Sequence, residues 1–94
     1  MQHIKLKFQD KSIIILSGRP FGEEVFNEQI APKIKDEKEI VLEFPPQIKS
    51  FSSSFPNGLL SSEVEELGLE NVKKKYIIFS EIDGVKEGFW ESFD

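Results

Sequence analysis

Short apolar runs that alternate with amphipathic helical stripes constrain the fold of this chain more than any other feature. Residues 4–8 alternate apolar side chains with lysines at period two, which is typical of a strand with one buried face. Residues 12–16 contain four consecutive aliphatic residues, as in a strand covered on both faces. Residues 40–44 and 76–79 are similar apolar runs. The chain therefore predicts four strands separated by helical segments.

Three segments have the apolar spacing of amphipathic helices. The first starts at Pro20, which suits a first helical turn, and its apolar face consists of Phe21, Val25, Phe26 and Ile30. The second covers residues 56–67 and ends at Gly68, which can take the left-handed conformation of a helix stop. The third carries Ile82, Val85, Phe89 and Phe93 at spacings of three and four. A charged connection at 36–39 precedes the third strand.

The order of these elements, β-β-α-β-α-β-α, predicts how the strands pair. A tight turn at residues 9–11 would join the first two strands in a hairpin. The right-handed crossover rule then makes the third strand parallel to the second, and a second helical crossover leads to the fourth. We expect an α/β fold with a mixed four-stranded sheet, an N-terminal hairpin and helices packed on the sheet. A chain of 94 residues forms one domain, spanning 1–94.

Composition excludes several classes of partner. The chain has 17 acidic and 12 basic residues, a net charge of -5, and no basic stripe, so we expect no nucleic-acid binding. It has no cysteine and no apolar stretch of about 20 residues that would span a membrane or begin a signal peptide. We therefore expect a cytoplasmic protein without a membrane partner.

Candidate catalytic groups are few. His3 is the only histidine, and we expect it at a frayed N-terminus facing solvent, where neither a metal site nor a catalytic triad can be assembled. Glu63, Glu65 and Glu66 are expected on the hydrated side of the second helix. No base is placed to activate a serine, so we expect no enzyme, no cofactor and no metal.

Three consecutive hydroxyls, Ser52, Ser53 and Ser54, precede the second helix. At a helix N-terminus the unpaired N–H groups and the helix dipole favour an anion such as phosphate, so one serine could be a regulatory or binding hydroxyl. The alternative is a simple helix cap, which contributes about 1 kcal/mol. Pro56 indicates that Phe55 or Ser54 is the cap and leaves Ser53 just outside the helix.

Three other side chains complete the candidate surface, and two of them have two interpretations. Arg19 could clamp an anion beside the serine segment, or it could be a surface arginine paired with Glu23 or Glu24. Trp90 could be exposed for a partner or a second copy of the chain, or it could pack against the sheet. Asn57, in the first turn of the second helix, is the third member.

Two motifs, together with the order of the elements, resemble a known family. Gly18-Arg19-Pro20-Phe21-Gly22 precedes the first helix, and Ser50-Phe51-Ser52-Ser53-Ser54-Phe55 precedes the second. Over residues 4–85 the chain resembles the STAS-like domain family of unknown function. That family is similar to bacterial anti-sigma-factor antagonists, in which a serine at a helix start is phosphorylated by a histidine-kinase-like ATPase and the modified protein releases its partner. On their Asp-Ser-Ser-Gly motif, Ser53 takes the place of the phosphorylated serine, whereas Ser52 and Phe55 replace the aspartate and the glycine.

The resemblance implies a non-catalytic protein-protein interaction module in bacterial signalling, switched by phosphorylation of Ser53. Its expected partner is a protein, such as a histidine-kinase-like ATPase. The expected contact surface comprises Arg19, Ser52, Ser53, Ser54, Asn57 and Trp90. One alternative is a small-molecule or anion receptor in which Arg19 and the serine hydroxyls hold a ligand at the C-terminal ends of the strands. Another is a permanently assembled accessory subunit with an apolar patch around Trp90.

Overall fold

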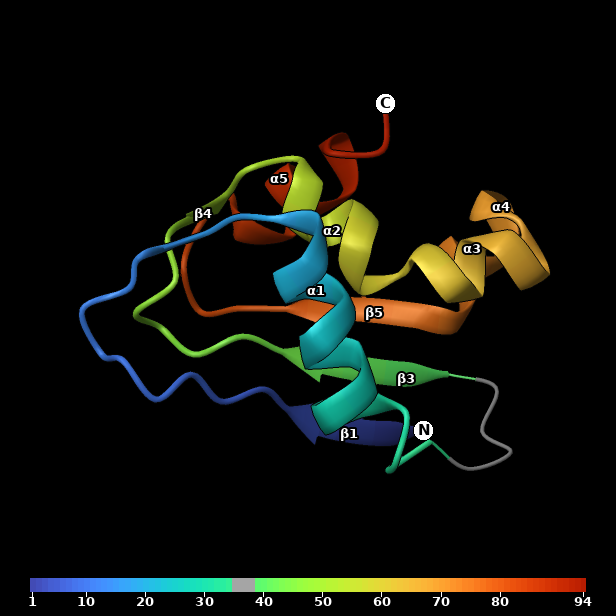
Figure 1. Cartoon of the computed structure of the whole chain (residues 1–94), viewed down its shortest axis with the longest axis horizontal. Helices are drawn as coiled ribbons and strands as arrows, with labels where there is room; N and C mark the ends of the chain where they lie inside the picture. Colours follow the sequence, from blue (N-terminus) through green and yellow to red (C-terminus); the bar gives the residue numbers. More distant parts are fainter. Residues whose placement is uncertain (35–38) are drawn as a thin grey trace.

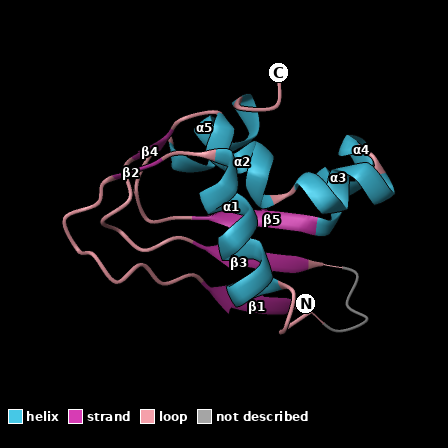
Figure 2. Cartoon of the chain, viewed as in Figure 1, coloured by secondary structure: helices cyan, strands magenta, loops and turns pink. Residues whose placement is uncertain are grey.

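Two small parallel sheets organise the chain in the computed structural model, which describes residues 1–34 and 39–94 (Figure 1). The larger sheet has the order β1-β3-β5, with β1 at Gln2–Lys5, β3 at Ile40–Glu43 and β5 at Tyr76–Phe79. The smaller sheet pairs β2, Ile15–Leu16, with β4, Ser50–Phe51. All three strand pairs are parallel, and along the sequence helical segments separate the two strands of each pair (Figure 2). The prediction of an α/β fold is confirmed.

Five α-helices and one π-helical segment accompany these sheets in the described ranges. They are α1 at Arg19–Val25, η1 at Phe26–Ile30, α2 at Ser54–Leu59, α3 at Ser61–Leu67, α4 at Leu69–Lys75 and α5 at Val85–Glu91. The π-helix η1 continues α1 directly, because Phe26 has α-helical dihedral angles. None of these helices has the length and apolar character needed to cross a bilayer.

The predicted mixed four-stranded sheet with an N-terminal hairpin is wrong. The chain does turn after residue 8, since the Ile13 amide donates to the Asp10 carbonyl oxygen at 3.2 Å. The segments on either side of this turn do not pair with each other. Instead β1 pairs with β3, and β2 pairs with β4. The third strand is therefore parallel to the first and not to the second. The charged connection expected at 36–39 lies, except for Glu39, outside the described residues.

The second predicted strand is also shorter and more open than expected. Only Ile15 and Leu16 form strand β2, and Ile14 and Ile15 are 52% and 53% exposed. The prediction that residues 12–16 are covered on both faces is therefore wrong. An uninterrupted aliphatic run does not by itself show that both faces of a strand are covered.

The second predicted helix is divided into shorter pieces. It begins at Ser54 instead of Pro56 and breaks at Leu60, whose φ and ψ of -106° and 13° are not helical. Gly68, with a φ of 84°, ends α3 as predicted and also precedes α4. Helix α4 was not predicted, because its seven residues contain only Leu69 and Val72 as apolar side chains.

The core lies on one face of the larger sheet. Ile4, Leu42 and Ile78 are aligned across the three strands and are almost completely buried. Helix α1 crosses this sheet in Figure 1, and Val25 and Ile30 belong to the same buried cluster. The other helices contribute Phe55, Leu59, Val72 and Phe89, with Val64 and Leu67 of α3 packed against it. The core therefore lies between this face of the sheet and the helices.

Helices α1 and α2 contact each other through two glycines. A Cβ atom on Gly22 would overlap the carbonyl oxygen of Phe55 and come within 2.6 Å of the Leu59 nitrogen. A Cβ atom on Gly58 would overlap the carbonyl oxygen of Arg19 and come within 2.8 Å of its Cα. Only glycine permits this approach of two helix backbones. The contact brings the first turns of the two helices together.

Candidate binding surface at the serine loop

The serine loop, residues 52–54, connects β4 to α2. Parallel pairing with β2 continues into this loop, because the Ser52 amide donates to the Leu16 carbonyl oxygen at 2.9 Å. The Ser52 carbonyl oxygen then accepts from the Phe55 amide at 3.0 Å, in the first turn of α2. Since β2 leads into α1 in the same way, the loops that start the two helices lie side by side.

Ser54 joins these two loops. Its half-buried hydroxyl accepts a hydrogen bond from the Gly18 amide at 3.0 Å and lies 3.2 Å from the Ser52 hydroxyl. Gly18 has a φ of 98°, so its backbone conformation favours glycine. The Ser54 hydroxyl therefore has a structural partner in the neighbouring loop.

Ser53 has a different environment. It is exposed and is the N-cap residue of α2, but its side chain makes no capping hydrogen bond. Its hydroxyl has no hydrogen-bond partner among the residues that the structure describes, whereas its carbonyl oxygen accepts from the Asn57 side chain at 2.8 Å. The prediction that Ser54 or Phe55 is the cap is wrong, because both already lie inside the helix in spite of Pro56.

Arg19 does not share a pocket with the serine hydroxyls. Its side chain is 57% exposed, and Nε lies 4.0 Å from an oxygen of Glu23, one helical turn away. This is the surface ion pair that was the alternative interpretation. The pocket beside Arg19 has a volume of about 220 Å³ and is completed by Asn57, Ser61, Val64, Glu65 and Phe93. The expected clamp made by Arg19 and residues 52–54 is therefore not assembled around this pocket.

Asn57 connects the start of α2 to the end of α5. Its side-chain nitrogen donates to the carbonyl oxygens of Ser53 and Ser92, at 2.8 and 2.7 Å. Trp90 is half-buried and packs its ring against Phe89 and Phe93, with ring centroids 5.1 and 5.8 Å away. Trp90 thus packs within the C-terminal aromatic cluster and is only partly available to a partner.

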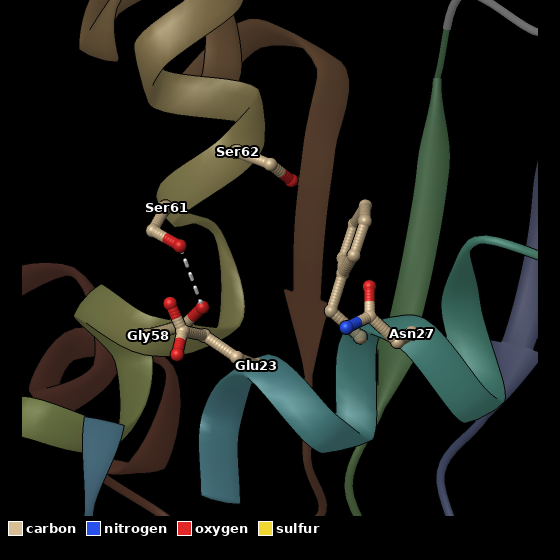
Figure 3. Close-up of a pocket in the computed structure, with 6 residues that line it drawn as sticks. Glu23, Asn27, Gly58, Ser61 and Ser62 are labelled. Atoms are coloured by element: carbon tan, nitrogen blue, oxygen red, sulfur yellow. Dashed lines mark hydrogen bonds between the residues drawn. The ribbon is translucent and has the colours of Figure 1, made fainter. Parts of the chain in front are cut away.

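A second pocket, not anticipated from the sequence, lies between the first helix and the break after α2 (Figure 3). It has a volume of about 300 Å³, with Glu23, Phe26 and Asn27 on one side and Gly58, Ser61 and Ser62 on the other. The Ser61 hydroxyl donates to the Gly58 carbonyl oxygen at 3.1 Å. A repeated pattern could have indicated the contact beneath it, since Pro20-Phe21-Gly22 in α1 and Pro56-Asn57-Gly58 in α2 have the same Pro-x-Gly pattern.

Glu63 lies in the interior and not on a hydrated face, so the expectation for this residue is wrong. It is only 8% exposed. One oxygen of its carboxylate accepts from Lys75 Nζ at 2.5 Å and from the Tyr76 hydroxyl at 2.8 Å. Burial, followed by the hydrogen bond and the charge of Glu63, raises the pKa of the Tyr76 hydroxyl far above its ordinary value. The break at Leu60 gives α3 its own orientation, which the periodicity of one continuous helix does not predict.

His3 belongs to β1 and not to a frayed terminus, so that expectation is wrong too. Its side chain is exposed, as expected, but Nε2 lies 2.7 Å from an oxygen of Glu43 on the neighbouring strand. Within residues 1–34 and 39–94, no three or more histidine, aspartate or glutamate side chains form a group that could hold a metal ion.

Comparisons of this chain with protein-family models, with curated proteins and with solved structures find no match. The function of the chain is therefore inferred from the contacts of its side chains and from its sequence motifs.

Proposed function

We propose that this chain is a non-catalytic protein-protein interaction module of bacterial signalling, related to the STAS-like domains and switched by phosphorylation of Ser53. One observation carries the proposal. Ser53 combines an exposed side chain with a hydroxyl that has no hydrogen-bond partner in the described part of the chain. The Ser54 hydroxyl already accepts a hydrogen bond from the Gly18 amide, and the Ser52 hydroxyl lies within hydrogen-bond distance of the Ser54 hydroxyl. Ser53 is thus the member of the serine loop that a kinase can modify without breaking a contact.

The surface around Ser53 suits an interaction that depends on charge. A phosphoryl group adds about 1.5 to 2 negative charges at pH 7 and three strong acceptor oxygens. The chain already carries a net charge of -5, so the modified surface would repel an acidic partner and attract a cluster of arginines. Phosphorylation of Ser53 therefore acts as a release switch for the first kind of partner and as a docking switch for the second.

The candidate partner is a histidine-kinase-like ATPase, as the family resemblance implies. In this proposal the ATPase binds the serine loop and α2, and Asn57 holds the carbonyl oxygen of Ser53 in place. Arg19 lies at the start of the adjacent helix and adds an exposed positive charge to the same surface. Cytoplasmic localisation is part of this proposal, because the kinase and its ATP are found there.

The two alternative functions have less support. A small-molecule or anion receptor needs Arg19 and the serine hydroxyls around one cavity, whereas the pocket of Arg19 is completed by side chains of α2, α3 and the C-terminus. A permanently assembled subunit needs an open apolar patch at Trp90, whereas this ring packs on Phe89 and Phe93.

Mass spectrometry on tagged protein purified from its native cells tests the proposal. The tryptic peptide that spans residues 50–73 should carry a phosphoryl group, and fragmentation should place it on Ser53. A kinase-like ATPase should be present in the same eluate. The Ser53→Ala variant should lose the modification, whereas Ser52→Ala, a change at the adjacent exposed serine, should retain it. Phosphate on Ser52 or Ser54, or an unmodified peptide under all growth conditions, would refute the switch.

A further inference from the structure

The larger sheet has a second face, opposite the core. Because side chains alternate along a strand, the register places His3, Val41 and Ile77 in one row of this outer face. Lys5, Glu43 and Phe79 form the next row. The outer face is defined here as these six residues. Its charged side chains lie on β1 and β3, and its apolar side chains lie on β3 and β5.

The helices of the described chain do not pack on this face. Each of them contributes side chains to, or packs against, the core cluster that contains Ile4, Leu42 and Ile78, which point the opposite way. Val41, Ile77 and Phe79 are absent from that cluster, and Phe79 is 45% exposed. Val41 is only 7% exposed, so the centre of this surface is largely shielded from solvent.

All-parallel sheets occur almost only where both faces are covered by other elements, usually helices. Here one face of a parallel sheet has its helical layer and the other has none in the described chain. We propose that the outer face is the docking surface for an amphipathic helix of a partner protein, with the apolar stripe of that helix on Val41, Ile77 and Phe79 and an acidic residue opposite Lys5. This inference does not depend on the serine loop.

The size of the outer face favours one helix over a second copy of the chain. Three strands separated by about 4.8 Å span roughly 10 Å, which equals the diameter of an α-helix with its side chains. Four residues per strand extend about 10 Å along the other direction. Such a patch is far smaller than the roughly 800 Å² per partner of a standard interface between folded proteins, so face-to-face dimerisation through it alone would be weak.

The charged side chains of the outer face indicate which charge the docked helix should carry. Glu43 is already paired with His3 at 2.7 Å. Lys5 is exposed and has no ion pair with any described residue, so it is the charged side chain of this face that a docked helix can still pair. A glutamate or aspartate on the flank of the helix would complement Lys5, whereas a basic flank would be repelled.

Site-specific photo-crosslinking identifies the occupant. The full chain carrying a photoreactive phenylalanine analogue at position 79 is expressed in its native cells, and position 73, which is exposed on α4, serves as the control. The crosslinked peptide is sequenced, synthesised and titrated against the purified protein by fluorescence anisotropy. We expect a crosslink at position 79 only, to a segment whose apolar residues recur at helical spacing beside an acidic flank.

Two variants then test the contacts. Phe79→Asp should weaken binding of the synthetic peptide at least tenfold, whereas Ile15→Asp, at a similarly exposed aliphatic side chain of the other sheet, should not change it. Lys5→Glu should weaken binding severalfold, and replacing the acidic residue of the peptide by lysine should restore it. Unchanged thermal unfolding of both variants would show that they fold. A crosslink to a second copy of the chain, a non-helical segment, or equal products at positions 79 and 73 would overturn the proposal.

Discussion

Gly22 on α1 and Gly58 on α2 each lie against the backbone of the other helix. The first faces Phe55 and Leu59, and the second faces Arg19. Each glycine follows a proline by two residues, and Gly22 is the fourth residue of α1 while Gly58 is the fifth of α2. The contact is therefore reciprocal, and it fixes the start of α1 beside the serine loop.

Replacing either glycine by alanine should destabilise the protein. Alanine in a helix normally gains about 1 kcal/mol over glycine. At Gly22 or Gly58 the new methyl group would overlap backbone atoms that cannot move aside, so we expect a net loss of about 2 kcal/mol. Urea unfolding measures this difference. Gly88→Ala is the matched control, because no other part of the described chain lies within 4 Å of its Cβ position, so stability should be unchanged or higher. Equal effects at all three positions would contradict the close helix contact.

The serines should separate into a structural and a non-structural group. Ser54→Ala leaves the half-buried Gly18 amide without its acceptor and should cost about 1 to 2 kcal/mol. Ser53→Ala removes a hydroxyl without a partner among the described residues and should change stability by less than about 0.5 kcal/mol. Thermal unfolding of the two variants side by side provides the comparison. A larger loss for Ser53→Ala would show that this hydroxyl, and not that of Ser54, holds the loop.

Tyr76 should make the protein less stable at high pH. Its pKa is raised by burial and by Glu63, so the unfolded chain ionises this tyrosine first. The stability that the protonated hydroxyl contributes is full below the unfolded pKa of about 10 and is lost as the pH rises above it. Tyr76 is the only tyrosine, so phenolate absorbance reports on it alone.

We expect the phenolate signal to appear only when the protein unfolds. Tyr76→Phe is the control, because it removes this contribution while the lysines still titrate in both proteins. The difference in unfolding free energy between wild type and variant should therefore shrink above about pH 10. Phenolate absorbance near pH 10 in a protein with native circular dichroism would contradict the buried hydrogen bond to Glu63.

Asn57→Ala should loosen the C-terminus more than the rest of the molecule. The variant loses two hydrogen bonds, to the carbonyl oxygens of Ser53 and Ser92, at a cost of about 1 kcal/mol each. Hydrogen exchange should accelerate in residues 92–94 and at the start of α2, with little change in β3. Uniform acceleration throughout the chain would indicate that Asn57 supports the whole fold instead.

Local sequence patterns predicted the helices and strands themselves better than they predicted which strands pair with each other. The first and last helices and the strands at 40–43 and 76–79 follow from periodicity and from prolines and glycines at their ends. The pairing of strands does not, because a buried apolar run fits several neighbours equally well. The expected hairpin was inferred from a real turn at Asp10, but a turn does not decide which strand each side joins.

For the candidate surface, the proximity of the two loops was predicted, but the contacts of their side chains were not. Helix starts and their neighbouring loops indicated that Arg19 and residues 52–54 lie close together, and the Gly18–Ser54 hydrogen bond agrees with that. The role of each serine could not be predicted, since it depends on which hydroxyl faces the other loop. The burial of Glu63 also depends on long-range contacts, with Lys75 and Tyr76 more than ten residues away.

The parallel pairing of every described strand has a consequence for folding kinetics. Gln2 pairs with Ile40, Ile15 with Ser50 and Ile40 with Tyr76, so the partners are 38, 35 and 36 positions apart. A nascent chain cannot form the first of these pairs until residue 40 has left the ribosome, and the sheet stays incomplete until β5 emerges. Such high contact order slows folding, and the apolar strands remain open to chaperones during most of synthesis.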